Sequence, residues 1–243
     1  MIPFGPAFGM AGRRFIEFNV TANDDTLNVA TLVGTTADAP FILFNLNGHD
    51  ILTTNTTQIA INASTVNDFC DLVIDFEGGK ARARGGDGGD GGWEDADPTQ
   101  FFPGGPGGAG GTAISLGCNT KAVGPGDVLG GFGGGGGGGS QVGADGCGGG
   151  GGAPLGLKGV NRSIGNNPEP ADGTDATELA NGVGGTANGL NGGNGGDGGG
   201  APQDGENGVP ALGGDAGANG KAVDLNGFTW TTSGGLNIVG AVS

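Results

Sequence analysis

The chain carries few side chains that can do covalent chemistry. Its single histidine, His49, stands next to Asp50. A catalytic dyad of this kind needs a nucleophile and an enclosing pocket, and the surrounding sequence offers neither. Because Asn47-Gly48 comes just before it, the pattern instead predicts that His49 lies in a polar hairpin turn. We therefore expect no enzymatic activity.

The carboxylates and thiols also lack the spacing of a reactive site. Five acidic residues cluster in one short stretch: Asp87, Asp90, Glu94, Asp95 and Asp97. They are too close together, in too polar a context, to work as a paired acid and base. The three cysteines share no metal-ligand spacing: Cys70, Cys118 and Cys147. With one histidine in the chain, the sequence predicts thiols kept in a reducing compartment, no metal site and no cofactor.

Aromatic side chains beside the acidic cluster favour recognition over catalysis. Trp93, Phe101 and Phe102 flank the acidic stretch 94–98, which reads EDADP. Rings of this size supply a large contact area at low entropic cost, and the neighbouring carboxylates attract cationic groups on a partner. The same rings are equally suited to cap the end of a folded unit. The sequence leaves both roles open.

The elements that position these residues have to accommodate a large amount of glycine. Glycine accounts for 63 of the 243 residues, and 54 of these lie between Gly78 and Gly220. Glycine has no side chain to bury, and ordering so many costs about 30–50 kcal/mol more than ordering alanine. The middle of the chain is therefore either disordered or held by a dense lattice of backbone hydrogen bonds.

Composition divides the chain into residues 1–77, 78–220 and 221–243. The first part has only five glycines and predicts six short strands: 13–20, 26–33, 40–46, 50–53, 58–63 and 69–76. Such strands make a small sandwich or barrel with a modest core. The last part predicts strands over 222–231 and 236–242. The expected fold is a mainly β N-terminal domain, a glycine-rich middle region with loops, and a short C-terminal β closing segment.

The glycine region has a period of three residues in two places. Residues 85–92 read GGDGGDGG, and residues 191–199 read NGGNGGDGG. A polyproline II backbone has three residues per turn, so two glycines in each triplet leave two bare faces along which neighbouring segments can pack closely. The third residue of each triplet is then expected on an exposed face. This pattern predicts rods joined side by side by backbone hydrogen bonds.

Two other structures compete with a glycine lattice. A flexible, disordered region has a similar composition. A calcium-binding β-roll is built from tandem nonapeptide repeats, and residues 85–90 and 192–197 match the first six positions of that repeat. However, the position that should be aliphatic falls on Gly92 and Gly199, and the two matches are isolated rather than in tandem. Collagen is excluded, since the strict Gly-X-Y repeat with abundant proline is missing.

The net charge limits the classes of partner. The formal charge is −16 and the isoelectric point is about 4.1, so nucleic acid and anionic membrane surfaces are poor partners. No apolar run reaches the roughly 18–20 residues that a membrane-spanning helix needs.

The glycine runs and the end of the chain resemble a known protein family. The runs are 107–114 (GGAGGTAI), 130–139 and 148–155 (GGGGGAPL), and residues 220–242 read GKAVDLNGFTWTTSGGLNIVGAV. Together they resemble the glycine-rich receptor-binding tips of tailed phages. The closing segments of those proteins contain an apolar-Thr-Trp triplet and end in a Gly-x-apolar-Gly-x-apolar pattern. The likeness covers roughly residues 85–243, about two-thirds of the chain.

This resemblance implies a tail fibre or tail-tip adhesin in which polyglycine II helices stack as a sandwich. Loops joining the rods would contact a receptor on the bacterial cell surface, and residues 1–77 would attach to other phage tail proteins. The candidate receptor-binding residues are Trp93, Glu94, Asp95, Phe101, Phe102, Asp127, Phe132 and Arg162. They belong to the stretches 93–102, 127–132 and 161–167, with 203–207 as a further stretch. Trp230 matches the closing motif and is expected to be structural.

The resemblance places the chain in the virion tail and at the host surface during attachment. Either a homotrimer or a monomeric cap is consistent with it. Two other functions remain open at this stage: a structural virion protein that decorates the capsid or joins the tail, and a calcium-stabilised β-roll.

Overall fold

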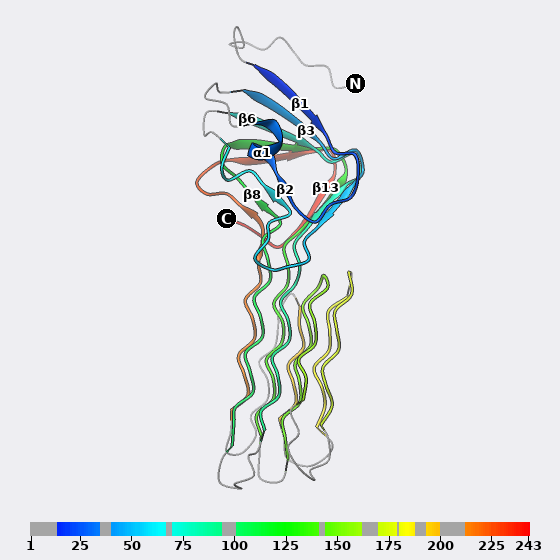
Figure 1. Cartoon of the computed structure of the whole chain (residues 1–243), viewed down its shortest axis with the longest axis vertical. Helices are drawn as coiled ribbons and strands as arrows, with labels where there is room; N and C mark the ends of the chain where they lie inside the picture. The colour runs from blue at the N-terminus through cyan, green and yellow to red at the C-terminus, as the bar shows by residue number, and fades with distance from the viewer. Residues whose placement is uncertain are drawn as a thin grey trace.

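The computed structural model describes residues 14–34, 40–66, 70–93, 101–140, 144–161, 170–178, 180–187, 193–199 and 212–243. These residues form a block of short strands from which long, roughly parallel segments extend in one direction (Figure 1). The structure is therefore mostly β with almost no helix.

The strands form three sheets in which every neighbouring pair is parallel. The first sheet contains β1 (Phe15–Asn19), β3 (Phe41–Asn45), β6 (Asp71–Asp75), β9 (Asn119–Val123) and β12 (Trp230–Ser233). The second contains β4 (Asp50–Leu52), β7 (Lys80–Arg82), β10 (Gly126–Leu129) and β13 (Leu236–Val239). The third contains β2 (Leu27–Asn28), β5 (Ile61–Asn62), β8 (Ile114–Ser115), β11 (Lys221–Asp224) and β14 (Ala241–Val242).

The chain visits the three sheets in turn, so each coil adds one strand to each sheet. The second coil, for example, runs through β3, β4 and β5, and the third through β6, β7 and β8. In the first coil, a bridge between Asp24 and Ile51 takes the place of a strand in the second sheet. We call the strands β1–β14, with the helix α1 (Val29–Val33), the solenoid.

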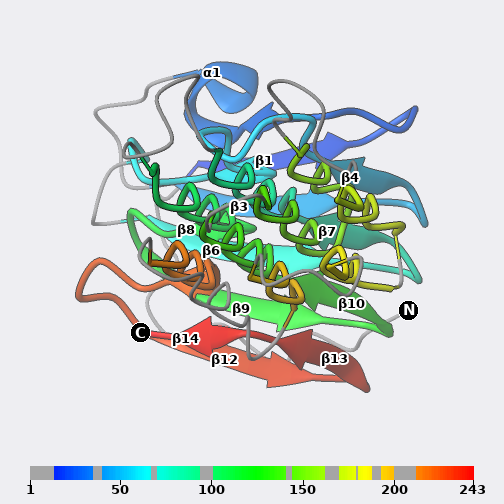
Figure 2. The ribbon, with the colours of Figure 1, turned by 90° about the horizontal axis from the view of Figure 1, so that it is seen from below.

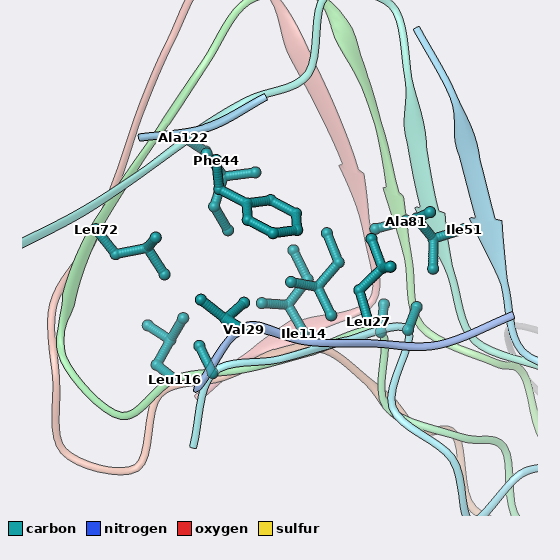
Figure 3. Close-up of a cluster of buried hydrophobic side chains, with 14 of the residues drawn as sticks. Leu27, Val29, Phe44, Ile51, Leu72, Ala81, Ile114, Leu116 and Ala122 are labelled. Carbon is teal, nitrogen blue, oxygen red and sulfur yellow. The ribbon is translucent and has the colours of Figure 1, made fainter. Parts of the chain in front are cut away.

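Apolar side chains from all three sheets meet inside the solenoid (Figure 3). The inward positions alternate along β3 and β6, where Ile42, Phe44, Leu72 and Ile74 are each at most 1 % exposed. Because parallel strands stack like residues over like residues, equivalent side chains form ladders, and the rings of Phe18 and Phe44 stack with centroids 5.1 Å apart. The core is therefore continuous through the coils.

Turns with left-handed backbone end the strands of the first sheet. Asn47 and Gly48 have φ of 51° and 76°, and the N–H of His49 donates to the carbonyl of Leu46 over 2.9 Å. Asparagine and glycine tolerate these φ values, which most residues avoid. A turn at Asn47-Gly48 with His49 beside it is confirmed, but it is not the predicted hairpin, because it joins β3 and β4, which belong to different sheets.

Several features of the strand region differ from the expectations. The predicted strands 222–231 and 236–242 are each two strands in different sheets, β11 with β12 and β13 with β14, since the chain turns from one sheet to the next within them. The predicted strand 26–33 is the two-residue β2 followed by α1, because the Asn28 side chain accepts a hydrogen bond from the N–H of Thr31 over 3.0 Å and caps a helix. The predicted sandwich or barrel is a parallel solenoid instead. Alternation of apolar and polar residues marks a strand with two unlike faces, but it does not distinguish parallel from antiparallel neighbours.

The glycine-rich segments are insertions into the solenoid rather than a region that follows it. One insertion lies between β7 and β8, and the other between β10 and β11. The boundaries expected at residues 77 and 220 are therefore not the limits of the solenoid, since β7–β10 lie between them and β11–β14 complete its sheets. We call the described segments 85–93, 101–111, 130–140, 144–152, 156–161, 170–176, 181–187, 193–199 and 212–220 the glycine bundle.

Backbone hydrogen bonds join the segments of the glycine bundle at every third residue. The N–H groups of Gly86, Gly89 and Gly92 donate to Phe132, Gly135 and Gly138 of the segment 130–140, each over 2.8 Å. Segment 144–152 bonds in this way to six others: 85–93, 130–140, 156–161, 170–176, 181–187 and 193–199. Seen end-on, the segments are narrow coils packed side by side (Figure 2). Buried backbone groups of the bundle therefore find partners within the chain.

The spacing between these segments leaves no room for side chains. A Cβ atom added at Gly89 would lie 2.0 Å from the carbonyl oxygen of Gly105, and one at Gly135 would lie 2.0 Å from that of Gly196. Neither distance is compatible with a real contact, so the interior positions require glycine for space. This is the physical reason for the composition of the middle of the chain.

Polar side chains complete the hydrogen bonding where the lattice ends. Asp87 and Asp90 accept hydrogen bonds from the N–H groups of Leu157 and Val160, over 2.8 and 3.2 Å. Asp175 does the same for the N–H of Lys158. The third residue of a triplet is therefore not simply a solvent-exposed position, because its carboxylate satisfies the backbone of the next segment.

Candidate functional site

Aromatic residues gather at the far end of the glycine bundle, which we define as the end away from the solenoid. Trp93 ends the first segment that leaves the solenoid, and Phe101 and Phe102 begin the segment that returns to it. The rings of Trp93 and Phe102 stack with centroids 4.4 Å apart and planes 14° from parallel. All three side chains are half-buried. The structure thus brings together the three aromatic residues that the sequence singled out.

The same far end contains a buried hydroxyl that the sequence did not single out. Ser140, at the end of a run of seven glycines, is 0 % exposed. Its hydroxyl donates to the carbonyl oxygen of Phe102 over 2.9 Å and accepts from the N–H of Phe102 over 3.2 Å. The N–H of Phe102 also points at the carbonyl oxygen of Trp93, 3.0 Å away. Three segments of the bundle therefore meet at Phe102.

Asp145 is a second buried polar residue missed in the sequence, and its side chain is 2 % exposed. It stands near the start of the segment 144–152, just after the segment that Ser140 ends. The signal that marks both residues is a single polar side chain next to a long glycine run. Nothing local in such a run shows which segment will lie beside it.

Three predicted site residues lie outside the described residues: Glu94, Asp95 and Arg162. The candidate stretch 203–207 and all of 161–167 except Asn161 do so as well. The proposed attraction of cationic groups by the acidic stretch 94–98 therefore stays a prediction.

Asp127 was expected in a receptor-binding loop, and the structure places it in a strand of the solenoid. It lies on β10, where one carboxylate oxygen is 3.3 Å from Nη2 of Arg82 and the other accepts a hydrogen bond of 3.2 Å from Nδ2 of Asn237. Both oxygens are thus engaged within the chain. The loop expectation was wrong because β10 pairs with β7 and β13, which are distant in sequence.

Phe132 was also expected in a loop and lies elsewhere. It stands where the segment 130–140 leaves the solenoid, and its backbone bonds to Ala153 and Gly86. It is therefore at the opposite end of the bundle from Trp93. Trp230, predicted to be structural, packs against the core from β12.

An ion pair joins the bundle to the solenoid. Arg82 on β7 is 5 % exposed, and its Nη1 lies 3.6 Å from a carboxylate oxygen of Glu178, which follows the segment 170–176. Asp24, Asp50 and Glu178 line a cavity of about 150 Å³ beside Arg82. A second cavity of 240 Å³ borders β2 and β5. Both are smaller than the roughly 300–1,000 Å³ of ordinary small-molecule pockets.

One cysteine of the solenoid has a thiol of low reactivity. Burial raises the pKa of the Cys118 thiol to about 12, and the neighbouring Cys70 adds to the effect. Cys118 is therefore protonated at neutral pH and inert. Within the described ranges, no group of three or more His, Cys, Asp or Glu side chains is placed to hold a metal ion. Across the same residues, no helix has the length and apolar character to cross a membrane.

The comparisons with known proteins agree with this architecture. The family model of phage tail fibre adhesin Gp38 matches residues 15–243. A chain of the crystal structure of the gp37-gp38 adhesin tip complex of the bacteriophage S16 long tail fibre matches with a TM-score of 0.53 and 22 % identity, over 95 % of this chain and 82 % of that one. No curated protein sequence matches. The chain belongs to the Gp38 family of phage tail fibre adhesins, and so is a receptor-binding protein of the virion tail.

Proposed function

We propose that the chain recognises the bacterial surface with the far end of its glycine bundle. The observation that carries this proposal is the stacked pair of Trp93 and Phe102 at that end. The interior segments consist of glycines packed too closely for side chains, so they have nothing with which to discriminate one surface from another. Half-buried aromatic rings at the end of a rigid scaffold have the area and rigidity of a binding hot spot.

We assign the segments of the bundle to polyglycine II helices. The three-residue repeat of the hydrogen bonds and the six neighbours of segment 144–152 support this assignment. A chain with this structure gives a polyproline II-type circular dichroism spectrum and unfolds cooperatively. Flat, non-cooperative melting with fast amide exchange in the bundle would contradict the assignment.

We further propose that the solenoid attaches the chain to the fibre through its N-terminal part, residues 1–77. The first coil begins with β1, the edge strand of the first sheet, and the ring of Phe15 on it is 56 % exposed while stacking on Phe41. An edge strand with an exposed aromatic residue is suited to pair with another protein. The variant Phe15→Ala should fold normally and co-purify less with the partner fibre protein. The variant Val242→Ala, at a residue 41 % exposed on β14 and outside residues 1–77, is the control.

One copy of the chain is sufficient for the proposed role. Support for a monomer comes from the hydrogen bonds that join the segments of the bundle within a single chain. Light scattering of the purified chain distinguishes a monomer from the homotrimer that the family resemblance also allows. Adhesion by this design involves no catalysis, which agrees with membership of an adhesin family.

Cell binding by the purified chain tests the receptor-binding surface. A fluorescently labelled chain should bind cells of the bacterium that the phage infects, and Trp93→Ala and Phe102→Ala should reduce binding by about tenfold or more. Val183→Ala removes an apolar side chain that is 56 % exposed on the flank of the bundle, and should leave binding unchanged. Equal losses in all three variants would contradict a surface confined to the far end.

A further inference from the structure

Ser140 has a side chain that bonds across segments at the far end of the bundle. The seven residues before it, 133–139, are all glycine, which can offer only backbone groups. Its hydroxyl both donates to and accepts from the backbone of Phe102, at 2.9 and 3.2 Å. A single hydroxyl thus occupies both backbone groups of one aromatic residue, and it does so while fully buried.

Phe102 is joined in turn to Trp93. The two rings stack at 4.4 Å, and the N–H of Phe102 points at the carbonyl of Trp93 as well as at Ser140. The hydroxyl therefore adds the bonds nearest the rings to the backbone bonds, such as that from Gly92 to Gly138, that fix the ring pair relative to the segment 130–140. Without it, the carbonyl and N–H of Phe102 lose their only described bonds to that segment.

We propose that Ser140 is a positioning residue for receptor binding, which acts by holding the Trp93–Phe102 pair in a fixed orientation. This inference rests on the proposed function, because it assumes that the aromatic pair contacts the receptor. A surface that is already ordered before binding loses less conformational entropy when the receptor docks. The contribution of Ser140 is thus to receptor affinity, and it acts through the rings rather than by touching the receptor.

A buried hydroxyl also stabilises the fold, so the test needs a matched control. Thr53 is equally buried, at 0 % exposure, and its hydroxyl accepts a hydrogen bond of 2.7 Å from the N–H of Arg84. It lies at the solenoid end of the bundle, away from the aromatic pair. Thr53→Val removes that bond while keeping the shape of the side chain. Ser140→Ala and Ser140→Gly remove the hydroxyl at the far end, and glycine is the residue that already occupies the seven preceding positions.

The expected result separates binding from stability. All variants should melt at a lower temperature than the unmodified chain, but only the Ser140 variants should bind host cells more weakly, by about tenfold. In a Trp230→Phe background, Trp93 is the only tryptophan, and its fluorescence anisotropy should fall in the Ser140 variants and not in Thr53→Val. In a Trp93→Ala background, Ser140→Gly should have no further effect on binding, since the rings through which it acts are already disrupted.

Different results overturn different parts of the argument. If Trp93→Ala weakens cell binding but the Ser140 variants bind like the unmodified chain, the role of Ser140 is wrong and the receptor-binding surface stands. The role is also wrong if Thr53→Val weakens binding as much, or if Ser140→Gly has its full effect without Trp93. If Trp93→Ala and the Ser140 variants all bind normally, both the surface and the inference fail.

Discussion

Asn194 and Asp197, three positions apart in one glycine segment, each accept a hydrogen bond from the backbone of the neighbouring segment. Asn194 Oδ1 accepts a hydrogen bond of 2.7 Å from the N–H of Ala187, and Asp197 Oδ1 accepts one of 2.8 Å from the N–H of Gly184. Both donors belong to the neighbouring segment 181–187. The edge of the lattice therefore requires a side-chain oxygen that accepts a hydrogen bond, and it does not require a negative charge.

This equivalence predicts the effect of two substitutions at one position. Asp197→Asn keeps an acceptor oxygen and should change the free energy of unfolding by less than about 0.5 kcal/mol. Asp197→Ala leaves the N–H of Gly184 without its partner in a half-buried place, and should cost about 1–3 kcal/mol. Urea denaturation of the three proteins checks both values. Equal losses in Asn and Ala variants would show that the charge, rather than the oxygen, is needed.

Two adjacent glycines in the segment 101–111 should respond differently to alanine. A Cβ at Gly104 would lie 1.9 Å from the carbonyl oxygen of Gly137, whereas at Gly105 the nearest atom is the nitrogen of Asp90 at 3.2 Å. Gly104→Ala therefore requires two segments to separate, and should cost at least about 3 kcal/mol or prevent folding. Gly105→Ala should cost less than about 1 kcal/mol, because small shifts relieve the contact and alanine restricts the unfolded chain. Thermal melting of the pair provides the comparison.

The pair of Lys158 and Asp172 predicts a dependence of stability on pH. The hydrogen bond of 2.8 Å from Lys158 Nζ, together with one from the N–H of Asn161, lowers the pKa of the Asp172 carboxyl. A carboxyl whose pKa is lower in the folded chain stabilises the fold above its unfolded pKa, near pH 4, and this contribution is lost as the pH falls through the folded value. The hydrogen bond to Asp172 likewise raises the pKa of Lys158, so its contribution is lost only in strong alkali.

Lys158→Met should therefore melt below the unmodified chain at pH 7, and the difference should shrink as the pH falls from 4 to 2. Since both side chains are partly exposed, at 39 % and 33 %, the difference is small and is best measured at low ionic strength. Lys121→Met, at an exposed lysine on β9, is the control. A difference that stays constant down to pH 2 would mean that the ion pair does not cause it.

The cysteines report separately on the two parts of the molecule. Cys118 lies in the solenoid and Cys147 in the glycine bundle, and both are 0 % exposed. At pH 8 neither should react with a thiol reagent while the chain is folded; for Cys118 the raised pKa adds to the protection by burial. A substitution that opens the bundle, such as Gly104→Ala, should accelerate labelling of Cys147 more than of Cys118. Mass spectrometry of labelled peptides measures the two rates, and equal acceleration would indicate that bundle and solenoid open together.

Much of the solenoid could be predicted from local sequence, but its topology could not. The strands around Phe44 and Ile74 were found because their apolar residues alternate. The repeat that makes them parallel is also visible, since FIEFN, FILFN and DLVID begin at residues 15, 41 and 71. Repeats of 20–50 residues are typical of solenoids. The repeat is not regular in the later coils because the glycine insertions separate their strands, so that β9 and β12 begin 111 residues apart.

The candidate site was predictable only where its chemistry is local. Trp93 and Phe102 are large aromatics at the ends of glycine runs, and their types and positions were enough to select them. The role of Ser140 depends on a segment 38 positions earlier, and no local pattern encodes which segments are neighbours in a lattice. Asp127 was misplaced for the same reason, because its partners Arg82 and Asn237 come from coils 45 and 110 positions away.

The two insertions also determine how the molecule transmits force. The backbone passes between solenoid and bundle four times, after β7, before β8, after β10 and before β11. A force that pulls on the far end of the bundle, as when a virion drifts while held to a cell, is therefore divided among four backbone connections rather than carried by one. Because hydrogen bonds join the segments of the bundle along their length, the segments share the force and resist extension together. The bundle is thus joined to the solenoid by four connections that bear load in parallel.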